Sequence, residues 1–272
     1  MLSDDERHAL LEKSHQMTRR AFAAMMATNG QSVPGNYLRE SQEAWDEWVG
    51  AGETVRPPPV IKPMPPVTKP VASVMVLAHR RDPEGIALLG EATRSVQAQT
   101  LEGVQCVVQD AEAWWPDKIN DGVKATSSPY VAILCYDDLL APTFMAETVS
   151  VAEETGADIV YTDRLCFGMK PAFVLRSPRA VSPDYFQFDQ PFPMTCLIRR
   201  TWWDQVGGYD GSLGLCDGDF WFRSIMAGAK VACQPGPLFH YREHAGQGSQ
   251  TMDVLWHYDR CYEKWRSLGL IE

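Results

Sequence analysis

Two adjacent carboxylates, Asp137 and Asp138, stand at the end of an apolar run in the segment 131–142, VAILCYDDLLAP. The run is typical of a buried strand. Neighbouring carboxylates at the end of such a strand repel each other and resist burial, so a cation or polyvalent ligand stabilises them. The segment is therefore a candidate metal and ligand site. A solvated acidic turn is the alternative, because aspartate is common in turns.

The surrounding chain alternates between strand and helix patterns, which predicts crossover connections and a mostly parallel sheet. Ligands of such sheets gather at the carboxyl ends of the strands. Asp110 follows the second predicted strand, and Asp137 and Asp138 follow the third, so all three are expected at one edge. This coincidence favours a site over an acidic turn. The predicted strands are 71–78, 104–108, 131–135, one beginning at 158–161, 194–199 and one resuming at 230–232, and the predicted helices are 85–99 and 142–155.

A proline-rich segment divides the chain. Residues 56–70, RPPPVIKPMPPVTKP, contain seven prolines, which excludes a helix or a central strand and predicts an extended linker. We therefore predict an N-terminal helical appendage at 1–55, with helices at 4–28 and 38–49. Packing without chemistry of its own is favoured for the appendage over a functional module. The main domain is predicted at 71–250, and a C-terminal helix at 251–272 is expected to pack on it.

Composition limits the function classes. The chain has 272 residues, of which 45% are hydrophobic, enough for one large domain with an appendage. A net charge of −10 argues against nucleic acid as the default partner. The seven cysteines include no Cys-x-x-Cys pair, which favours reduced thiols over disulfides or a zinc site. The sequence shows no apolar signal core and no membrane-spanning run, so we expect a soluble, cytoplasmic protein.

A series of short motifs accompanies these elements. They are LAHR at 77–80, SVQAQT at 95–100, CVVQD at 106–110, Asn120 with Gly122 and Ala125, GGYD at 207–210, CDGDFWFR at 216–223 and YREH at 241–244. Their order resembles the GT-A glycosyltransferases, most closely the family-2-type inverting enzymes, over residues 72–250. The resemblance implies a Rossmann-like α/β fold with a mostly parallel central sheet flanked by helices. It also implies transfer of a sugar from a nucleotide-diphosphate sugar to a hydroxyl acceptor, namely a saccharide, a lipid or a modified nucleobase.

The resemblance assigns a role to each candidate site residue. Asp138 is the direct metal ligand, and His244 completes the metal shell. Hard oxygen ligands suit Mg²⁺ or Mn²⁺, which would stabilise the departing diphosphate. Asp137 touches the ribose or a metal-bound water. The remaining donor-binding candidates are Asp110 for the base, Arg242 for the diphosphate, and Ala78, His79 and Arg80 beside the nucleotide, although an exposed basic turn explains His79 and Arg80 equally well.

Asp217 is the expected catalytic base in the block 216–223. In an inverting transfer, a carboxylate takes the proton of the acceptor hydroxyl while this attacks the anomeric carbon opposite the diphosphate. The alternative is that Asp217 only caps a helix. Asp219 and Arg223 are four residues apart, so we expect them to form a structural pair on one helix face.

Two cysteines depart from the family pattern. Cys135 and Cys216 stand where the family carries acids, which leaves open a catalytically degenerate protein that binds nucleotide-sugar without turnover. A second alternative is a phage-type enzyme that glycosylates a modified DNA base, against which the acidic charge argues mildly. Trp114 and Trp115 are predicted in a loop lining the donor pocket, Trp202 and Trp203 are predicted in the core, and GQGS at 246–249 is predicted to form a mobile flap over the donor.

Overall fold

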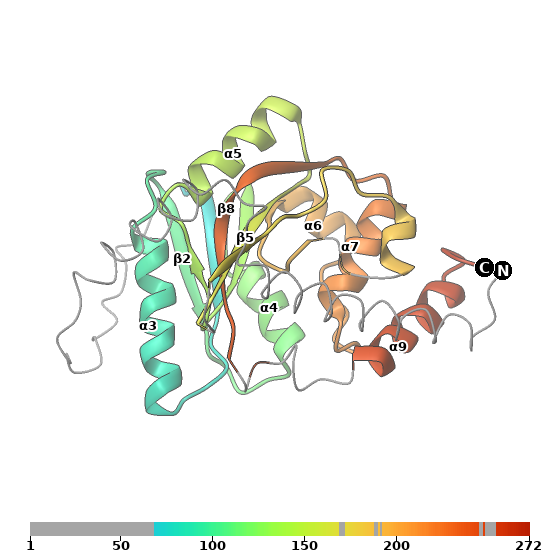
Figure 1. Ribbon diagram of the computed structural model, residues 1–272, viewed down its shortest axis with the longest axis horizontal. Coiled ribbons are helices and arrows are strands. Elements are labelled where there is room, and N and C mark those ends of the chain that lie inside the picture. Colours follow the sequence, from blue (N-terminus) through green and yellow to red (C-terminus); the bar gives the residue numbers. More distant parts are fainter. Residues whose placement is uncertain (1–67, 169–171, 188–189, 191, 245–246, 248–253) are drawn as a thin grey trace.

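A computed structural model describes residues 68–168, 172–187, 190, 192–244, 247 and 254–272 (Figure 1). The predicted helices at 4–28 and 38–49, nearly all of the linker 56–70 and most of the predicted flap at 246–249 lie outside these residues. The described part forms one α/β unit.

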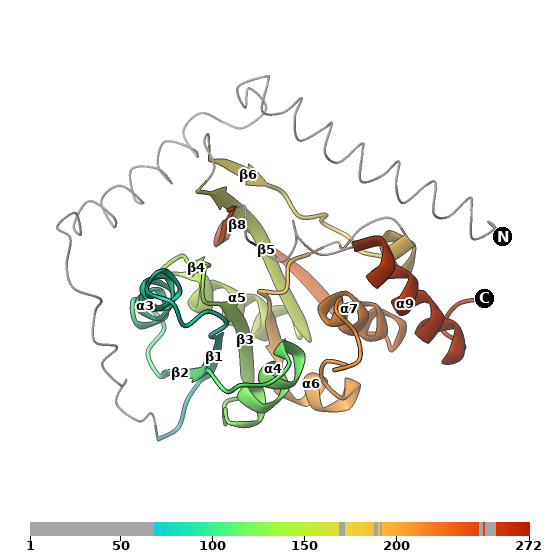
Figure 2. The same cartoon turned by 90° about the horizontal axis from the view of Figure 1, so that it is seen from below.

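One eight-stranded sheet organises the fold, with the strand order β2-β1-β3-β7-β5-β8-β4 and with β6 paired to β5. Its long strand β8 lies beside β5 in both views (Figures 1 and 2). The strands are β1 (Ala72–Leu77), β2 (Val104–Gln109), β3 (Tyr130–Cys135), β4 (Leu139–Leu140), β5 (Ile159–Phe167), β6 (Phe173–Leu175), β7 (Leu197–Arg199) and β8 (Val231–Arg242).

The sheet is mixed in direction. Strand β1 pairs in parallel with β2 and β3, and β5 pairs in parallel with β8. Strand β7 joins these two parallel blocks by running antiparallel to both β3 and β5. Antiparallel pairing does not require a crossover helix between paired strands. Strand β7 has only three residues and is followed directly by the helix that begins at Arg200.

Helices cover both faces of the sheet. They are α3 (Pro83–Gln97), α4 (Trp115–Lys124), α5 (Phe144–Thr155), α6 (Arg200–Val206), α7 (Cys216–Met226) and α9 (Val254–Ser267), with a short 3-10 helix η1 (Pro183–Gln187). Alternate residues of β1 point to opposite faces: Val74 and Val76 pack with α3 and α5, whereas Met75 and Leu77 pack with α4, α6, α7 and α9. Figure 2 shows α6, α7 and α9 gathered at one end of the sheet.

Most predicted elements exist with small shifts of their ends, and helix α5 ends at Gly156 in the left-handed conformation, as its pattern predicts. Helix α4 is a correction. Trp115 was predicted in a loop, but it begins α4, with Pro116 in the first turn where its missing N–H costs nothing. Trp114 precedes the helix and is half exposed, whereas Trp202 and Trp203 are buried in the core as predicted.

Candidate functional site

The ends of three parallel strands place the candidate residues at one edge. Leu77 at the end of β1 is in register with Gln109 of β2 and with Cys135 of β3. Hydrogen bonds continue this alignment past the strands, because Ala78 N donates to Gln109 O over 3.0 Å and Tyr136 N donates to Leu77 O over 3.1 Å. Ala78, Asp110 and Asp137 therefore follow neighbouring strand ends, as expected from the sequence.

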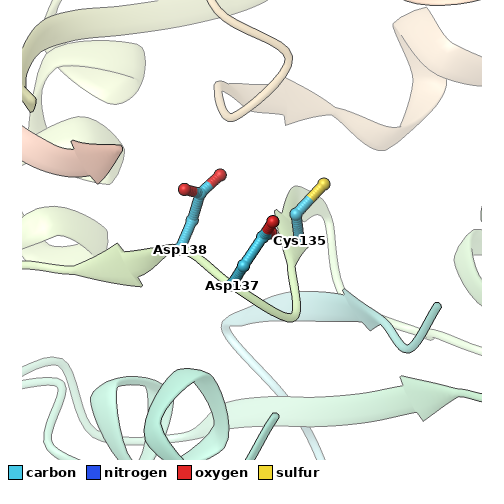
Figure 3. A group of neighbouring side chains, drawn as sticks. All are labelled: Cys135, Asp137 and Asp138. Carbon is cyan, nitrogen blue, oxygen red and sulfur yellow. The ribbon is translucent and has the colours of Figure 1, made fainter. Parts of the chain in front are cut away.

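The side chains of Cys135, Asp137 and Asp138 form a compact group. Their ligand atoms all lie within 4.8 Å of one another. Figure 3 shows the thiol and the two carboxylates projecting to the same side of the turn between β3 and β4. Asp138 is only 5% exposed, so its carboxylate has little water to solvate it.

The end of β8 brings two more predicted residues to this turn. Leu139 and Leu140 follow the carboxylates and pair antiparallel with His240 and Phe239 of β8. This register sets Arg242 against the aspartates: its backbone N–H donates to Asp138 Oδ1 over 2.8 Å, and its Nε donates to Asp137 O over 2.7 Å.

His244 lies beside Asp137. Its Nε2 is 3.0 Å from Asp137 Oδ2. The His244 backbone N–H donates to Gln247 Oε1 over 2.7 Å, which holds the turn after β8. The sequence-predicted residues Asp137, Asp138, Arg242 and His244 are thus brought together from two distant parts of the chain, and His244 reaches the group through Asp137.

The electrostatics of the turn favour a bound cation. Burial raises the pKa of Asp138 well above its ordinary value, the charge of Asp137 raises it further, and the Arg242 N–H opposes the shift. Burial also raises the pKa of Cys135, to which the charges of Asp137, Asp138 and Asp217 add. Negative charge is therefore costly here without compensation, and the carboxylate oxygens of Asp137 and Asp138 are ligands of the kind that a divalent cation takes.

The motif at 95–100 holds the segment that follows Asp138. Gln99 Nε2 donates to Ala141 O over 2.8 Å, and its Oε1 accepts from Met145 N over 2.9 Å. Ser95 Oγ accepts from Leu140 N over 3.2 Å, and Thr100 N donates to Pro142 O over 2.8 Å. The motif at the end of α3 thus holds the backbone of residues 140–145, which follow the two aspartates.

Asp217 lies in the first turn of α7. The N-cap position is Leu215, and the Asp217 carboxylate interacts with the backbone N–H groups of Asp217 and Gly218 in the first turn, so support of the helix start is compatible with this geometry. Gln190 Nε2 donates to Asp217 Oδ2 over 2.6 Å. Burial raises the pKa of Asp217, and the hydrogen bond from Gln190 opposes this shift. Because its charge also acts on Cys135, Asp217 is electrostatically linked to the metal-site candidates.

Asp219 has a structural role, as its spacing from Arg223 predicts. Its side chain is fully buried and accepts from Arg223 Nε over 2.8 Å, Lys264 Nζ over 2.8 Å and Trp265 Nε1 over 3.0 Å. These bonds join α7 to α9. Two aspartates only two positions apart therefore have different environments. The Asp219 carboxylate accepts from three side chains, whereas the Asp217 carboxylate accepts from the side chain of Gln190 and from the backbone N–H groups of Asp217 and Gly218.

The predicted donor-side turn after β1 contains exposed His79, whose ring centroid lies 6.5 Å from that of Tyr136. Arg80 is used inside the turn, because its Nε and Nη2 lie 2.8 Å from carboxylate oxygens of Asp82 and Glu84. Asp110 is exposed at the end of β2, and its backbone oxygen accepts from Arg81 Nη2 over 2.5 Å. Arg80 is therefore paired with acids of its own turn, and His79 and Asp110 are exposed, an arrangement that fits both a basic turn and a nucleotide-binding edge.

The motif residue Asn120 is hydrogen-bonded to the backbone of the GGYD motif at 207–210. Asn120 Nδ2 donates to Tyr209 O over 2.8 Å, and Tyr209 N donates to Asn120 Oδ1 over 2.9 Å. Gly208 has a φ of +70°, and a Cβ there would lie 2.7 Å from Asn120 Oδ1. Arg223 Nη2 donates to Gly208 O over 2.8 Å from α7. These residues position the start of the Asp217 block.

Sequence reasoning missed three residues near the site. Arg164, within the apolar strand β5, acts electrostatically on Asp138, and its buried Nε has no hydrogen-bond partner among the described residues. A positive charge interrupting an apolar run was the available signal. Glu91 pairs with Arg242 Nη2 over 2.5 Å, and Gln190 contacts Asp217; neither stands out in the sequence.

Comparison with solved structures identifies the fold. The described architecture is similar to Staphylococcus aureus TarS 1–349 in complex with UDP-GlcNAc, with a TM-score of 0.56 and 11% identity over 70% of this chain and 64% of that chain. The same protein in complex with UDP gives a TM-score of 0.52 and 11% identity over 64% and 61% of the two chains.

The described residues thus have a GT-A-like α/β fold. The chain spans less than two thirds of these TarS 1–349 chains. No protein-family model and no curated protein sequence matches the chain. Within the described ranges, no helix has the length and apolar character needed to cross a membrane.

Proposed function

We propose that the protein is a metal-dependent glycosyltransferase that moves a sugar from a nucleotide-diphosphate sugar to a hydroxyl acceptor with inversion. The observation that carries this proposal is the meeting of Asp137 and Asp138 with Arg242 and His244 at the strand ends of a GT-A-like fold. The TarS structures with UDP-GlcNAc and UDP bound support a nucleotide-sugar as the donor class.

Asp138 and His244 would hold the divalent cation, either Mn²⁺ or Mg²⁺, and Asp137 would hold the ribose or a metal-bound water. The cation supplies charge stabilisation to the diphosphate leaving group. Asp138 suits this role because its buried carboxylate accepts one N–H, that of Arg242, and forms no ion pair with an arginine or lysine in the described residues. The imidazole of His244 is oriented by Asp137.

Arg242 would bind the diphosphate. Its guanidinium is partly buried, lies 4.6 Å from the centroid of the Phe167 ring and is paired with Glu91. Packing and pairing fix the planar group, which suits it to oriented hydrogen bonding of phosphate oxygens. Asp110 would contact the base, and Ala78, His79 and Arg80 would border the nucleotide at the neighbouring strand end.

Asp217 would remove the proton of the acceptor hydroxyl. Its carboxylate is held by Gln190 and by the backbone N–H groups of Asp217 and Gly218. Because burial raises its pKa, the carboxylate is a stronger base than an exposed aspartate. Gln190 positions this group, whereas Asp219 supports the helix from which it projects.

The test measures donor binding and turnover separately. A panel of UDP-, GDP- and dTDP-sugars is tested with and without MnCl₂, by calorimetry for binding and by release of free nucleotide for transfer to acceptor or water. We expect one donor to bind in a Mn²⁺-dependent manner and to be turned over. Asp138→Ala should abolish the metal-dependent part of binding, whereas Asp217→Asn should keep binding and lose transfer.

A second candidate function is binding of a nucleotide-sugar without turnover. It is suggested by Cys135 and Cys216, which stand where the resembled family carries acids. Cys216 is fully buried in the core, so it cannot present an acidic or polar group to a substrate. A protein that binds nucleotide-sugar without turnover would show metal-dependent binding in the wild type and no nucleotide release with any acceptor. Absence of binding for every donor, with and without Mn²⁺, would contradict both functions.

A further inference from the structure

We propose that Cys135 is a protein ligand of the same cation, and that its sulfur makes the site prefer thiophilic divalent ions such as Zn²⁺ and Co²⁺ over Mg²⁺. The inference rests on the proposed metal site at Asp138. Cys135 stands where the resembled family carries an acid, and we assign to its sulfur the preference of the site among metal ions.

Geometry places the thiol among the ligands. Sγ of Cys135 and carboxylate oxygens of Asp137 and Asp138 lie within 4.8 Å of one another, and all three side chains project to one side of the turn (Figure 3). Metal–sulfur and metal–oxygen bonds are about 2.3 and 2.1 Å long, so the three donors must draw closer together to share one ion.

A second observation concerns the partners of Asp138. Asp138 is 5% exposed, and its carboxylate accepts the backbone N–H of Arg242, with no side-chain donor in the described residues. The guanidinium of Arg242 is directed to Asp137 O and Glu91 instead. A buried carboxylate without an ion-pair partner in the described residues thus lies beside a free thiol. A divalent ion satisfies both groups.

Charge and softness together explain the selectivity. On binding, the thiol releases its proton to solvent, and the resulting thiolate forms the metal–sulfur bond. Two carboxylates and one thiolate carry three negative charges, of which a divalent ion balances two. Thiolate ligands favour Zn²⁺ and Co²⁺, whereas Mg²⁺ prefers oxygen ligands in a nearly ideal octahedron. Replacement of an aspartate by Cys135 should therefore weaken Mg²⁺ binding more than Zn²⁺ or Co²⁺ binding.

Cys106 provides a matched control. Like Cys135 it is a free, partly buried cysteine on a strand of the parallel block, and burial raises its thiol pKa to about 12. It belongs to no cluster of potential metal ligands in the described residues. Cys106→Ser therefore removes a comparable thiol without touching the proposed site.

The test titrates the purified full chain with CoCl₂ and follows thiolate-to-cobalt charge-transfer absorption in the near ultraviolet. We expect the band in wild type and in Cys106→Ser, and its loss in Cys135→Ser together with an at least tenfold weaker Zn²⁺ affinity. Cys135→Asp should bind Mg²⁺ at least tenfold more tightly than wild type. A band that persists in Cys135→Ser, or no band in wild type, overturns the proposal.

A variant-free measurement covers the case in which Cys135→Ser does not fold. Wild-type protein is alkylated with iodoacetamide with and without Zn²⁺, and modification is located by mass spectrometry. Protection of Cys135 at least fivefold greater than that of Cys106 supports the proposal, and equal protection overturns it. Both readouts use the metal alone, so an absence of sugar transfer would contradict the proposed function without affecting this inference.

Discussion

The backbone N–H of Arg242 donates to Asp138 Oδ1 over 2.8 Å, joining residues 104 positions apart in the chain. This bond ties the end of β8 to the turn after β3. The bond gives one oxygen of the buried carboxylate a neutral donor. The negative charge of Asp138 therefore remains costly to bury. Several measurable properties depend on that relationship and on its neighbours.

The first prediction concerns stability and pH. Burial raises the pKa of Asp138 well above its ordinary value of 3.8, so the folded state binds this proton more tightly than the unfolded chain. The contribution of Asp138 to the free energy of unfolding is therefore fully present below pH 3.8 and is lost as the pH rises through the folded pKa, at about 1.4 kcal/mol per unit of pKa shift. Asp138→Asn should remove this loss, which urea denaturation from pH 4 to 8 measures.

The Asn variant is expected to be more stable than wild type at pH 7 without divalent ions. Added Mn²⁺ should stabilise wild type and leave Asp138→Asn unchanged. A variant whose stability follows that of wild type at every pH would show that Asp138 is not the costly group.

The second prediction separates two aspartates of α7. Asp217→Asn should abolish sugar transfer and change the free energy of unfolding by less than about 1 kcal/mol, because Asp217 has one side-chain partner. Asp219→Asn should destabilise the protein by about 3 kcal/mol, because the partly buried Arg223 and the buried Trp265 lose the charged acceptor that they share, while Lys264 keeps Asp210. Denaturation and nucleotide-release assays on the two variants provide the comparison. Equal effects of both changes on stability would contradict these assignments.

The third prediction concerns Gln99. Its side chain connects Ser95 O, Ala141 O and Met145 N, so Gln99→Ala should destabilise the protein by about 2 kcal/mol. It should also weaken metal binding, because the segment after Asp138 loses its support. Thermal denaturation and metal titration measure the two effects. Gln97→Ala, an exposed change at the end of the same helix, is the control and should leave both properties unchanged.

The fourth prediction compares two buried tyrosines. The hydroxyl of Tyr209 is buried and has no hydrogen-bond partner in the part of the chain that the structure describes, so Tyr209→Phe should leave the free energy of unfolding unchanged or raise it by about 1 kcal/mol. The hydroxyl of Tyr161 donates to Pro178 O over 2.6 Å. Tyr161→Phe should therefore lower the free energy of unfolding by about 1 kcal/mol. Chemical denaturation distinguishes the signs. A loss of stability in Tyr209→Phe would reveal a partner for its hydroxyl.

The sequence predicted the features that depend on local spacing. Apolar runs located β1, β2 and β3, and the four-residue separation of Asp219 and Arg223 predicted their pairing, because helical geometry brings such positions together. The strand ends placed Asp110 and Asp137 at one edge. Helix α4 was missed because its polar sequence begins with Trp115 and Pro116, which resemble a loop.

Features that depend on tertiary packing could not be read from spacing. Strand periodicity does not encode direction, so the antiparallel insertion of β7 was not predicted. The pairing of Glu91 with Arg242 and of Gln190 with Asp217 joins residues whose proximity only the folded sheet creates. The family resemblance suggested roles for Arg242 and His244, but the register of β4 with β8 explains how they reach the aspartates.

Strand β8 pairs with β5 along residues 231–234 and again along 239–242. The second stretch also pairs with β4 on its other side. Contacts between such distant segments close long loops, whose entropic cost delays them during folding. We therefore expect the sheet centre to assemble before the acidic turn acquires its partners. Divalent ions that bind the completed turn should slow unfolding more than they accelerate folding.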